Sequence, residues 1–386
     1  MEQLIIPILI ATLSLIAGRY LLPRLEKWWI HTEAARARSG YELHITPKPQ
    51  STFYYRLGNI EVPVKLLVGT PTQPYRQSEV KTTDEPIPHF EAEDYPYAII
   101  QAKPWLIEEQ RRKYGRGLEE NDLPRLTHWR QGFEDSSGKP MNLYLDFTRT
   151  TFFQFLATNR SLDYAVVAPS LLTPWKRNRT IRTAFVEDPY DPNGDSLLLA
   201  NPFSVHAVVI SRNLSQEPQD QVIITRRSEH VALYRGYYQS SASGWMVPKD
   251  IDDTGSLSPF VTAAREARLE IADGLEVRAS DFKLIGIAVN WRDLDLNAFG
   301  YFETGQAVAD LLGDFRQESY ETTWKGSLRF EPKAVLSHIE RNKWEPVSTV
   351  ALCATLLSLF DRQEVERAAR SVRAKGIPDF MEIEPK

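Results

Sequence analysis

Short apolar runs separated by polar turns dominate the chain from about Ala200 onward. Runs rich in β-branched and aromatic residues predict strands at 205–210, 221–228, 244–248, 282–290, 297–304 and 324–331. Apolar residues at helical spacing predict a helix over 258–275, with Ser258 as candidate N-cap and Pro259 in the first turn. A second predicted helix, 348–375, ends the fold and carries a basic tail. Strands around a central helix, closed by a C-terminal helix, predict an α/β sandwich with a mixed sheet.

One apolar run near the start has the length of a membrane span. Leu4 to Leu22 contains Arg19 as its only charge and would rise about 28 Å as a helix, close to the hydrocarbon thickness of a bilayer. Trp28 and Trp29 follow at interfacial depth, and basic residues follow the run rather than precede it. A cleaved signal peptide lacks its basic n-region and small-residue cleavage site here, and a buried helix is the other alternative. We expect a single-pass membrane anchor with the large C-terminal part in the cytoplasm.

The region between the anchor and the predicted sandwich is richer in proline and mixes both patterns. Strand-like pieces occur at 53–57 and 62–70, helical pieces at 104–118 and 147–159, and a strand followed by a turn at 126–140. Proline, glycine and aspartate concentrate in "EDPYDPNGD", 187–195, which indicates a boundary. We therefore expect an anchor with a basic juxtamembrane segment (1–40), an α+β region (41–195), the α/β domain (196–362) and a charged tail (363–386).

Composition removes several classes of chemistry. The 386 residues are 42% hydrophobic and 25% charged, which is typical of globular proteins, and the net charge of −5 gives no case for nucleic-acid binding. The single cysteine, Cys353, excludes an internal disulfide, and we expect it to be a buried hydrophobic residue. The seven histidines show no metal-ligand spacing, and the chain contains no CxxC, GxSxG or Walker-type loop.

Three acidic residues share one side of the predicted helix 258–275. Glu266, Glu270 and Asp273 stand at i, i+4 and i+7, which places them on one continuous stripe. From spacing alone, such a stripe is usually a solvated helix face. The alternative is a set of carboxylates that holds a hard divalent cation.

The order of elements around this helix resembles the Nudix hydrolases. Their signature is G-x5-E-x7-R-E-U-x-E-E-x-G-U, with U an aliphatic residue, and Arg265, Glu266 and Glu270 match it. Four fixed places differ, because Ile251, Leu257, Leu269 and Ala272 stand where the family has glycine, glutamate, glutamate and glycine.

Sequences outside the segment that carries this signature, here called the box, are similar to the UDP-sugar pyrophosphatase branch of the same family. "FFQFLATN" and "LLLANPFSVHAVVISRN" resemble the entry to its core, and "VIITRRS" followed by "GWMVP" resembles the two strands before the box. "LIGIAVN" and "ESYETTWKGSLRF" resemble the strand and the acidic loop after it. The resemblance covers about Leu143 to Phe360 and implies a Nudix-like α/β/α sandwich.

The resemblance also implies roles for the acidic residues. Glu266 and Glu270 would be catalytic residues and Mg²⁺ ligands. Asp273 is not a position of the signature, but its place on the same helical stripe would let it restore the carboxylate lost at 269. Arg265 would orient a glutamate, and Glu321 in the acidic loop would be a further metal ligand or base. Asp250, Asp252 and Asp253 lie in the loop before the helix, where the family's first acid is missing.

Other candidate contacts each have a structural alternative. Arg226 and Arg227 match phosphate geometry, although such a pair is equally common on a surface turn. Trp245 and Trp291 could stack on a base, but tryptophan in a strand usually packs in the core. The asparagines at 159 and 201 could be sugar contacts or turn residues.

Two functions follow. The first is a membrane-anchored, Mg²⁺-dependent Nudix-type hydrolase of a nucleoside diphosphate sugar or a related pyrophosphate compound. The second is a Nudix-fold nucleotide-binding sensor or protein-interaction scaffold without catalysis, because leucine at 257 and 269 removes charge that a magnesium site uses. The partner of the hydrolase is a nucleoside diphosphate-type small molecule, and that of the sensor or scaffold is a nucleotide or a partner protein. The resemblance favours a homodimer.

Overall fold

A mixed β-sheet forms the centre of the fold. The computed structural model describes residues 54–88, 121–132, 142–162, 181–182, 186, 199–212, 219–229, 231, 234–313 and 322–376. The sheet order is β13-β8-β7-β12-β11-β3, with β10 beside β7 and β9 beside β8. β12 runs parallel to β7, and the other neighbours are antiparallel. The strands are β3 (Val64–Gly69), β7 (Phe203–Ser211), β8 (Gln221–Arg227), β9 (Tyr238–Gln239), β10 (Ala242–Trp245), β11 (Lys283–Asn290), β12 (Leu296–Thr304) and β13 (Thr322–Arg329).

Strand β7 shows why the sheet is covered on both sides. All of its residues are buried. Successive side chains of a strand point to opposite faces. Val205, Ala207 and Val209 therefore enter one hydrophobic cluster, whereas Val208 and Ile210 enter another. A strand that is buried on both faces requires a cover on each.

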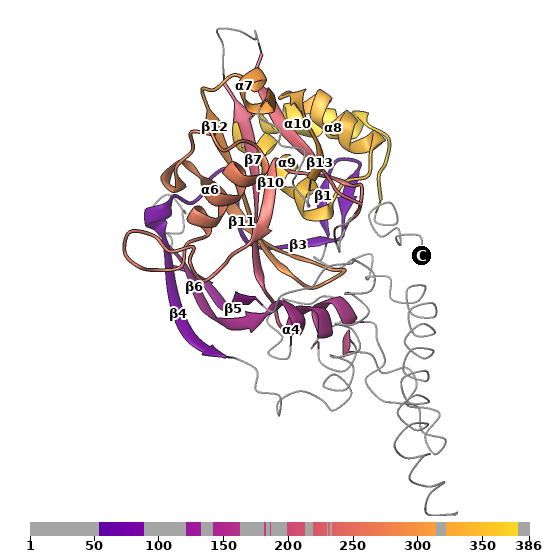
Figure 1. Cartoon of the computed structure of the whole chain (residues 1–386). Coiled ribbons are helices and arrows are strands. Elements are labelled where there is room, and N and C mark those ends of the chain that lie inside the picture. Colours follow the sequence, from indigo (N-terminus) through magenta and orange to yellow (C-terminus); the bar gives the residue numbers. More distant parts are fainter. Residues whose placement is uncertain are drawn as a thin grey trace, which may run out of the picture.

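Helices supply that cover. Helix α6 (Pro259–Glu270) packs on β10 and β7 on one face, and α9 (Pro346–Leu359) packs on β7, β11 and β12 on the other, beside α8 (Pro332–Arg341) and α10 (Arg362–Ser371). Figure 1 shows α6 on one side of the sheet and the yellow helices α8–α10 on the other. The predicted mixed-sheet α/β sandwich is therefore confirmed, and the strands expected at 205–210, 221–228, 282–290, 297–304 and 324–331 are present.

The C-terminal helix is two helices rather than the single one expected over 348–375. Asp361 accepts hydrogen bonds from the backbone N–H groups of Gln363 and Glu364, so it caps the start of α10. Val365 and Ala369 of α10 are buried in the cluster under α8 and α9. Most of α10 lies in the part that the sequence assigned to a charged tail, and it packs on the domain instead. Cys353 is buried in α9, as expected, and burial raises the pKa of its thiol to about 12.

The region before residue 196 forms a second, smaller sheet and also completes the first. Strands β4 (Val80–Pro88), β6 (Leu143–Thr151) and β5 (Asp122–Gln131) pair in that order. The hairpin β1 (Tyr55–Leu57) and β2 (Ile60–Val62) packs near α9 and α10, and β3 pairs with β11 in the main sheet. The strands expected at 53–57 and 62–70 are thus confirmed, and the second of them belongs to the main sheet.

The helix expected over 147–159 is wrong in its first part. β6 continues to Thr151, because the threonine-rich stretch 148–151 favours an extended backbone, and only then does α4 (Phe152–Ala157) begin. Thr151 and Gln154 form a capping box at that point. The remaining elements are η2 (Gln77–Glu79), η4 (Asn159–Ser161), η6 (Ala279–Asp281) and α7 (Val308–Gly313).

The anchor Leu4–Leu22, the helix expected over 104–118 and the boundary segment 187–195 lie outside the described residues. Within the described part of the chain, no helix combines the length and the apolar composition that a membrane crossing needs.

Asn159 joins the N-terminal region to the main sheet. Its side-chain amide donates to the carbonyls of Asp293 (2.9 Å) and Leu294 (3.3 Å) in the β11–β12 turn, and its Oδ1 accepts from the backbone N–H of Asn201 (3.1 Å). Asn201 has a φ of 41°, so it is a turn residue in the left-handed region. Both asparagines are 1% exposed, and Arg160 adds an ion pair to Asp293 (2.8 Å). Their hydrogen bonds are therefore used inside the protein rather than for a sugar.

We expect Asn159→Ala to lower the free energy of unfolding by about 1–3 kcal/mol, because it leaves buried carbonyls and an N–H without their partner. Asn121→Ala, at an exposed position of the same region, is the matched control and should change stability by less than about 0.5 kcal/mol. Chemical denaturation of both variants measures this, and equal midpoints would contradict the structural role.

The same turn holds a second acid close to Asp293, the half-buried Asp295. Asp293 Oδ2 and Asp295 Oδ1 are buried without a hydrogen-bond partner among the described residues. Burial, together with the charges of Asp293 and Glu345, raises the pKa of Asp295 to about 8. The folded protein therefore holds a proton on Asp295 that an unfolded chain, with an ordinary aspartate pKa near 3.9, has already released at neutral pH.

This shift predicts that stability falls with rising pH. The contribution of Asp295 is complete below about pH 4 and is lost as the pH rises through about 8, because the unfolded state binds fewer protons over that interval. Asp295→Asn should flatten the decline, since an amide does not titrate. Unfolding free energies measured from pH 5 to pH 9 test this, and parallel curves for the two proteins would rule it out.

Candidate functional site

The two glutamates of α6 face the sheet rather than solvent. Glu266 is 9% exposed and Glu270 is 7% exposed, and both lie on the helix side that also buries Ala263 and Ala267. A Cβ atom at Gly244 of β10 would lie 2.1 Å from Glu266 Oε1, so the carboxylate of Glu266 occupies the space that this glycine leaves. Of the two interpretations of the acidic stripe, a fully solvated face is therefore wrong for Glu266 and Glu270.

Glu270 is held by groups from the neighbouring strands. Its Oε2 accepts from the side-chain amide of Gln239 (3.0 Å), and its Oε1 accepts from the backbone N–H of Ser243 (3.4 Å). Gln239 in turn accepts from Arg227 Nη1 (2.7 Å) and from the hydroxyl of Ser243 (3.2 Å). Arg227 thus reaches Glu270 through Gln239. No sequence signal distinguishes this glutamine, whose role depends on strand pairing between β8 and β9.

Arg265 orients Glu266 and is itself fixed by Asp250. Arg265 Nε and Nη2 donate to the two carboxylate oxygens of Asp250 (2.7 and 2.8 Å), and Nη1 donates to Glu266 Oε1. A further bond joins Nη2 to the carbonyl of Trp245 (2.9 Å). Burial acts to lower the pKa of Arg265, but the hydrogen bond with Asp250 and the charges of Glu266 and Asp250 outweigh it and raise that pKa. The guanidinium therefore remains a permanent cation.

Asp250 is the acid that the loop before α6 contributes. It is 1% exposed, and its Oδ2 also accepts from Thr262 Oγ1 (2.9 Å) and from the backbone N–H of Val247 (3.0 Å). Asp252 instead caps its own turn through Thr254 (2.9 Å), and Asp253 is exposed. Of the three aspartates in this loop, Asp250 is the one that contacts the box arginine.

The predicted i, i+4, i+7 stripe does not extend to Asp273. Helix α6 ends at Glu270, and Asp273 follows in an exposed turn. The buried amine of Lys325 donates to the carbonyls of Ile271 and Leu311 (3.0 Å to the latter), which places a cation at the end of α6. Sequence alone gave no reason to select this lysine.

At position 269 a leucine stands where the signature of the Nudix hydrolases has a glutamate. Leu269 is 63% exposed, so a large apolar side chain projects into solvent beside the two glutamates. Glu321 lies outside the described residues. In the described ranges, no three or more His, Cys, Asp or Glu side chains are arranged to hold a metal ion. Magnesium, however, is commonly bound through one or two carboxylates together with substrate phosphates, and the Glu266–Glu270 pair fits that mode rather than a closed protein cage.

The residues predicted to contact the substrate lie in different parts of the structure. Arg226 and Arg227 are consecutive residues of β8, so their side chains leave opposite faces. Arg226 is exposed and donates to the carbonyl of Gly236 (2.8 Å), away from the Arg227–Gln239 contact. Trp245 is half-buried and packs against Phe152 and Phe155 of α4, with ring centroids 5.3 and 5.1 Å apart.

Trp291 is buried, and Arg182 lies over its ring at 4.4 Å. Both tryptophans therefore pack against other side chains of the protein, which was the alternative to stacking on a base. Of the predicted substrate residues, Arg227 is connected to Glu270 by its side chain, through Gln239, whereas Trp245 is connected to Glu266 by its backbone carbonyl, through Arg265.

Comparisons with known proteins give limited similarity. No protein-family model matches the chain, and no curated protein matches it. Among solved structures, a NUDIX hydrolase from Alicyclobacillus acidocaldarius is 16% identical with a TM-score of 0.31, covering 45% of this chain and 97% of that one. A Deinococcus radiodurans protein is 18% identical with a TM-score of 0.26, covering 39% and 80%. A mutT/nudix family protein from Listeria innocua is 12% identical with a TM-score of 0.28, covering 41% and 94%.

We expect Asp250→Ala to destabilise the fold by about 3 kcal/mol, because it leaves the Arg265 guanidinium partly buried without its partner. Asp253→Ala, in the same loop but exposed, should stay within about 0.5 kcal/mol of the natural protein. Thermal unfolding of the two variants makes the comparison. Similar losses in both would show that the Arg265–Asp250 pair does not fix α6.

Proposed function

We propose that residues 196–362 form a Nudix-type domain that hydrolyses a nucleoside diphosphate sugar or a related pyrophosphate compound. The observation that carries the proposal is the pair of buried carboxylates, Glu266 and Glu270, one helical turn apart on the face of α6 that meets β10. Glu266 keeps 12% of its side chain exposed, so a ligand at the edge of α6 can reach it. The resemblance of the surrounding sequence to the UDP-sugar pyrophosphatase branch supplies the substrate class.

The residues of the site divide into two roles. Glu266 and Glu270 are the residues that would hold Mg²⁺ together with the phosphates of the substrate. When bound, the ion neutralises charge on phosphoryl oxygens and lowers the pKa of a coordinated water. Arg265 and Gln239 are positioning residues, because each contacts one of the glutamates and fixes the direction of its carboxylate. Asp250 and Arg227 act one step further away, through Arg265 and Gln239.

Leucine replaces two acids of the signature, at positions 257 and 269, and other carboxylates take over part of their role. The acid missing at 257 has a counterpart in Asp250, which binds the box arginine with two parallel hydrogen bonds. The acid missing at 269 has no counterpart among the described residues near Glu270. We propose that Glu321 supplies it as a further ligand or base, and that Asp273 contributes charge at longer range.

A second candidate function is binding without hydrolysis, as a sensor or scaffold. The exposed Leu269 and the hydrogen bonds from Gln239 and Ser243 to Glu270 favour it, because both reduce the charge offered to a divalent cation. This candidate gives saturable binding of a nucleoside diphosphate sugar with no turnover in the presence of Mg²⁺.

Localisation and assembly belong to the same proposal. We propose that Leu4–Leu22 anchors the chain as a single span and that the domain faces the cytoplasm, on the basis of the length of this run and of the basic residues after it. A homodimer is proposed from the family resemblance alone.

The test of the hydrolase is Glu270→Gln, which preserves size and removes the charge. We expect Mg²⁺-dependent release of nucleoside monophosphate from UDP-glucose or ADP-ribose to fall at least about 100-fold in this variant. Glu276→Gln, an exposed residue just after α6, is the matched control and should retain full activity. Unchanged turnover in Glu270→Gln would contradict the assignment, and binding without turnover in the natural protein would favour the second candidate.

A further inference from the structure

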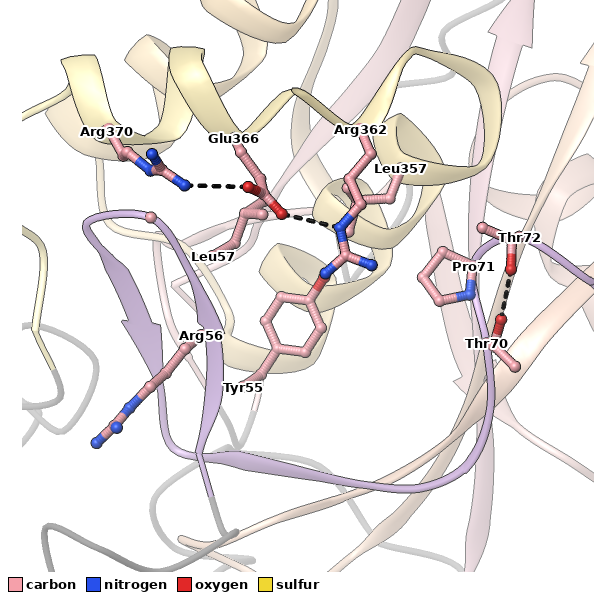
Figure 2. A pocket seen from close by; sticks show the side chains of 11 residues that line it. Tyr55, Arg56, Leu57, Thr70, Pro71, Thr72, Leu357, Arg362, Glu366 and Arg370 are labelled. Atoms are coloured by element: carbon pink, nitrogen blue, oxygen red, sulfur yellow. Dashed lines mark hydrogen bonds and ion pairs between the residues drawn. The ribbon is translucent and has the colours of Figure 1, made fainter. Parts of the chain in front are cut away.

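A pocket of about 500 Å³ lies on the other face of the sheet from α6. It is formed by β1, by the loop after β3, by the end of α9 and by one side of α10, and these segments lie at the two ends of the described chain. Figure 2 shows the side chains of Tyr55, Thr72 and Arg362 around it. The residues near it belong to the cluster under α8–α10, whereas the α6 site faces the other cluster. Its volume is in the range of small-molecule sites.

The walls of this pocket are fixed by hydrogen bonds from side chains to backbone carbonyls. The side-chain amide of Asn59, in the β1–β2 turn, donates to the carbonyls of Arg370 and Val372 (2.9 Å each), which satisfies the last turn of α10. Gly58 has a φ of 56°, and a Cβ there would lie 2.7 Å from the backbone of Ala369. On the opposite wall, Ser358 of α9 donates to the carbonyl of Pro71. The pocket is therefore formed before any ligand arrives.

One wall of the pocket carries a cationic excess. Arg362, Glu366 and Arg370 stand at i, i+4 and i+8 on α10, and the single carboxylate accepts from both guanidinium groups (2.8 and 3.1 Å). This trio has a net charge of +1 in a chain whose total is −5. Each arginine has five N–H donors and gives one of them to Glu366, so several remain for an anion. Arg56 also lines the pocket but is paired with Glu61, and its guanidinium points away from Tyr55 and Arg362 in Figure 2.

Tyr55 adds a buried donor beside Arg362. Its hydroxyl oxygen is buried and has no hydrogen-bond partner among the described residues. Burial raises the pKa of Tyr55 well above its ordinary value, the thiol of Cys353 adds to this, and Arg362 acts in the opposite direction. The phenol is therefore a neutral O–H donor. Thr70 and Thr72 place two hydroxyls on the facing wall, 2.9 Å apart.

Apolar side chains complete the lining. Leu57 of β1, Leu357 of α9 and Pro71 of the loop lie between the cationic and hydroxyl-bearing walls. A ligand that satisfies all three surfaces needs an anionic group with several acceptor oxygens, and an apolar body beside it. Guanidinium groups bind phosphate with matching geometry, and a phosphate offers more acceptor oxygens than a carboxylate.

We propose that this pocket binds a phosphate group attached to an apolar body, with the phosphate at Arg362, Thr72 and Tyr55 and the apolar body on Leu57, Leu357 and Pro71. Such a ligand is either a free phosphomonoester or the headgroup of an anionic lipid. The site is independent of the proposed hydrolase, because it lies on the opposite face of the sheet and uses no residue of α6.

The test is calorimetric titration of the full-length chain in EDTA, which removes metal-dependent binding at α6. The probes are phenyl phosphate, inorganic phosphate and phosphatidylcholine vesicles with or without phosphatidic acid. We expect phenyl phosphate to bind at least about 10-fold more tightly than inorganic phosphate, a difference of about 1.4 kcal/mol. A preference for phosphatidic acid vesicles over phenyl phosphate would identify a lipid headgroup as the source.

Variants assign the binding to this pocket. Arg362→Gln should weaken phenyl phosphate binding about 10-fold or more, and Tyr55→Phe should weaken it several-fold, because each removes a donor. Arg367→Gln, an exposed arginine of α10 outside the pocket, should leave affinity unchanged, as should Glu270→Gln. The proposal is overturned by no saturable binding of any probe up to about 10 mM, by equal affinity for phenyl phosphate and inorganic phosphate, or by equal losses in Arg362→Gln and Arg367→Gln.

Discussion

The pair of hydrogen bonds between Arg265 and Asp250 is the constraint on which the α6 site depends. It joins the middle of the helix to the loop before it, and the same guanidinium reaches Glu266 and the carbonyl of Trp245. Because Asp250 is almost fully buried, the arginine has one well-defined position. The direction of the Glu266 carboxylate follows from that position. A box that lacks several of the family's fixed residues can still orient one glutamate in this way.

The two faces of the sheet carry two sites of different chemistry. On the α6 face, carboxylates are held by Arg265, Gln239 and Ser243, which suits a cation that arrives with an anionic substrate. On the α8–α10 face, arginines and hydroxyls line an open pocket with apolar walls, which suits an anion. Strand β7 is buried along its whole length and contributes apolar side chains to the cluster on each face.

The layered fold was predictable because its signals are local. Apolar runs predicted β7, β8, β11, β12 and β13, and Pro259 marked the start of α6. The short strand β9 was not predicted, and β10 begins and ends earlier than the strand expected at 244–248. Tertiary effects caused the errors. The cation of Lys325 lies at the end of α6, which stops at Glu270 before the stripe reaches Asp273, and Asp361 begins a new helix where the apolar pattern seemed continuous. The identity of Glu266 and Glu270 as candidates came from spacing and resemblance. Their burial, and the contacts of Gln239 and Asp250, depend on strand pairing and loop packing. The pattern of hydrophobic and polar residues in the sequence does not reveal these.

The central claim is that Glu266 and Glu270 receive a divalent cation together with a diphosphate. A crystal structure of the chain with Mn²⁺ and a methylene-bridged, non-hydrolysable UDP-sugar analogue tests it directly. The account predicts the cation at about 2.0–2.2 Å from a carboxylate oxygen of at least one of these two glutamates and from a phosphate oxygen of the analogue. An analogue bound at α6 without a cation, or a cation held elsewhere while both glutamates keep their contacts to Arg265 and Gln239, would contradict it.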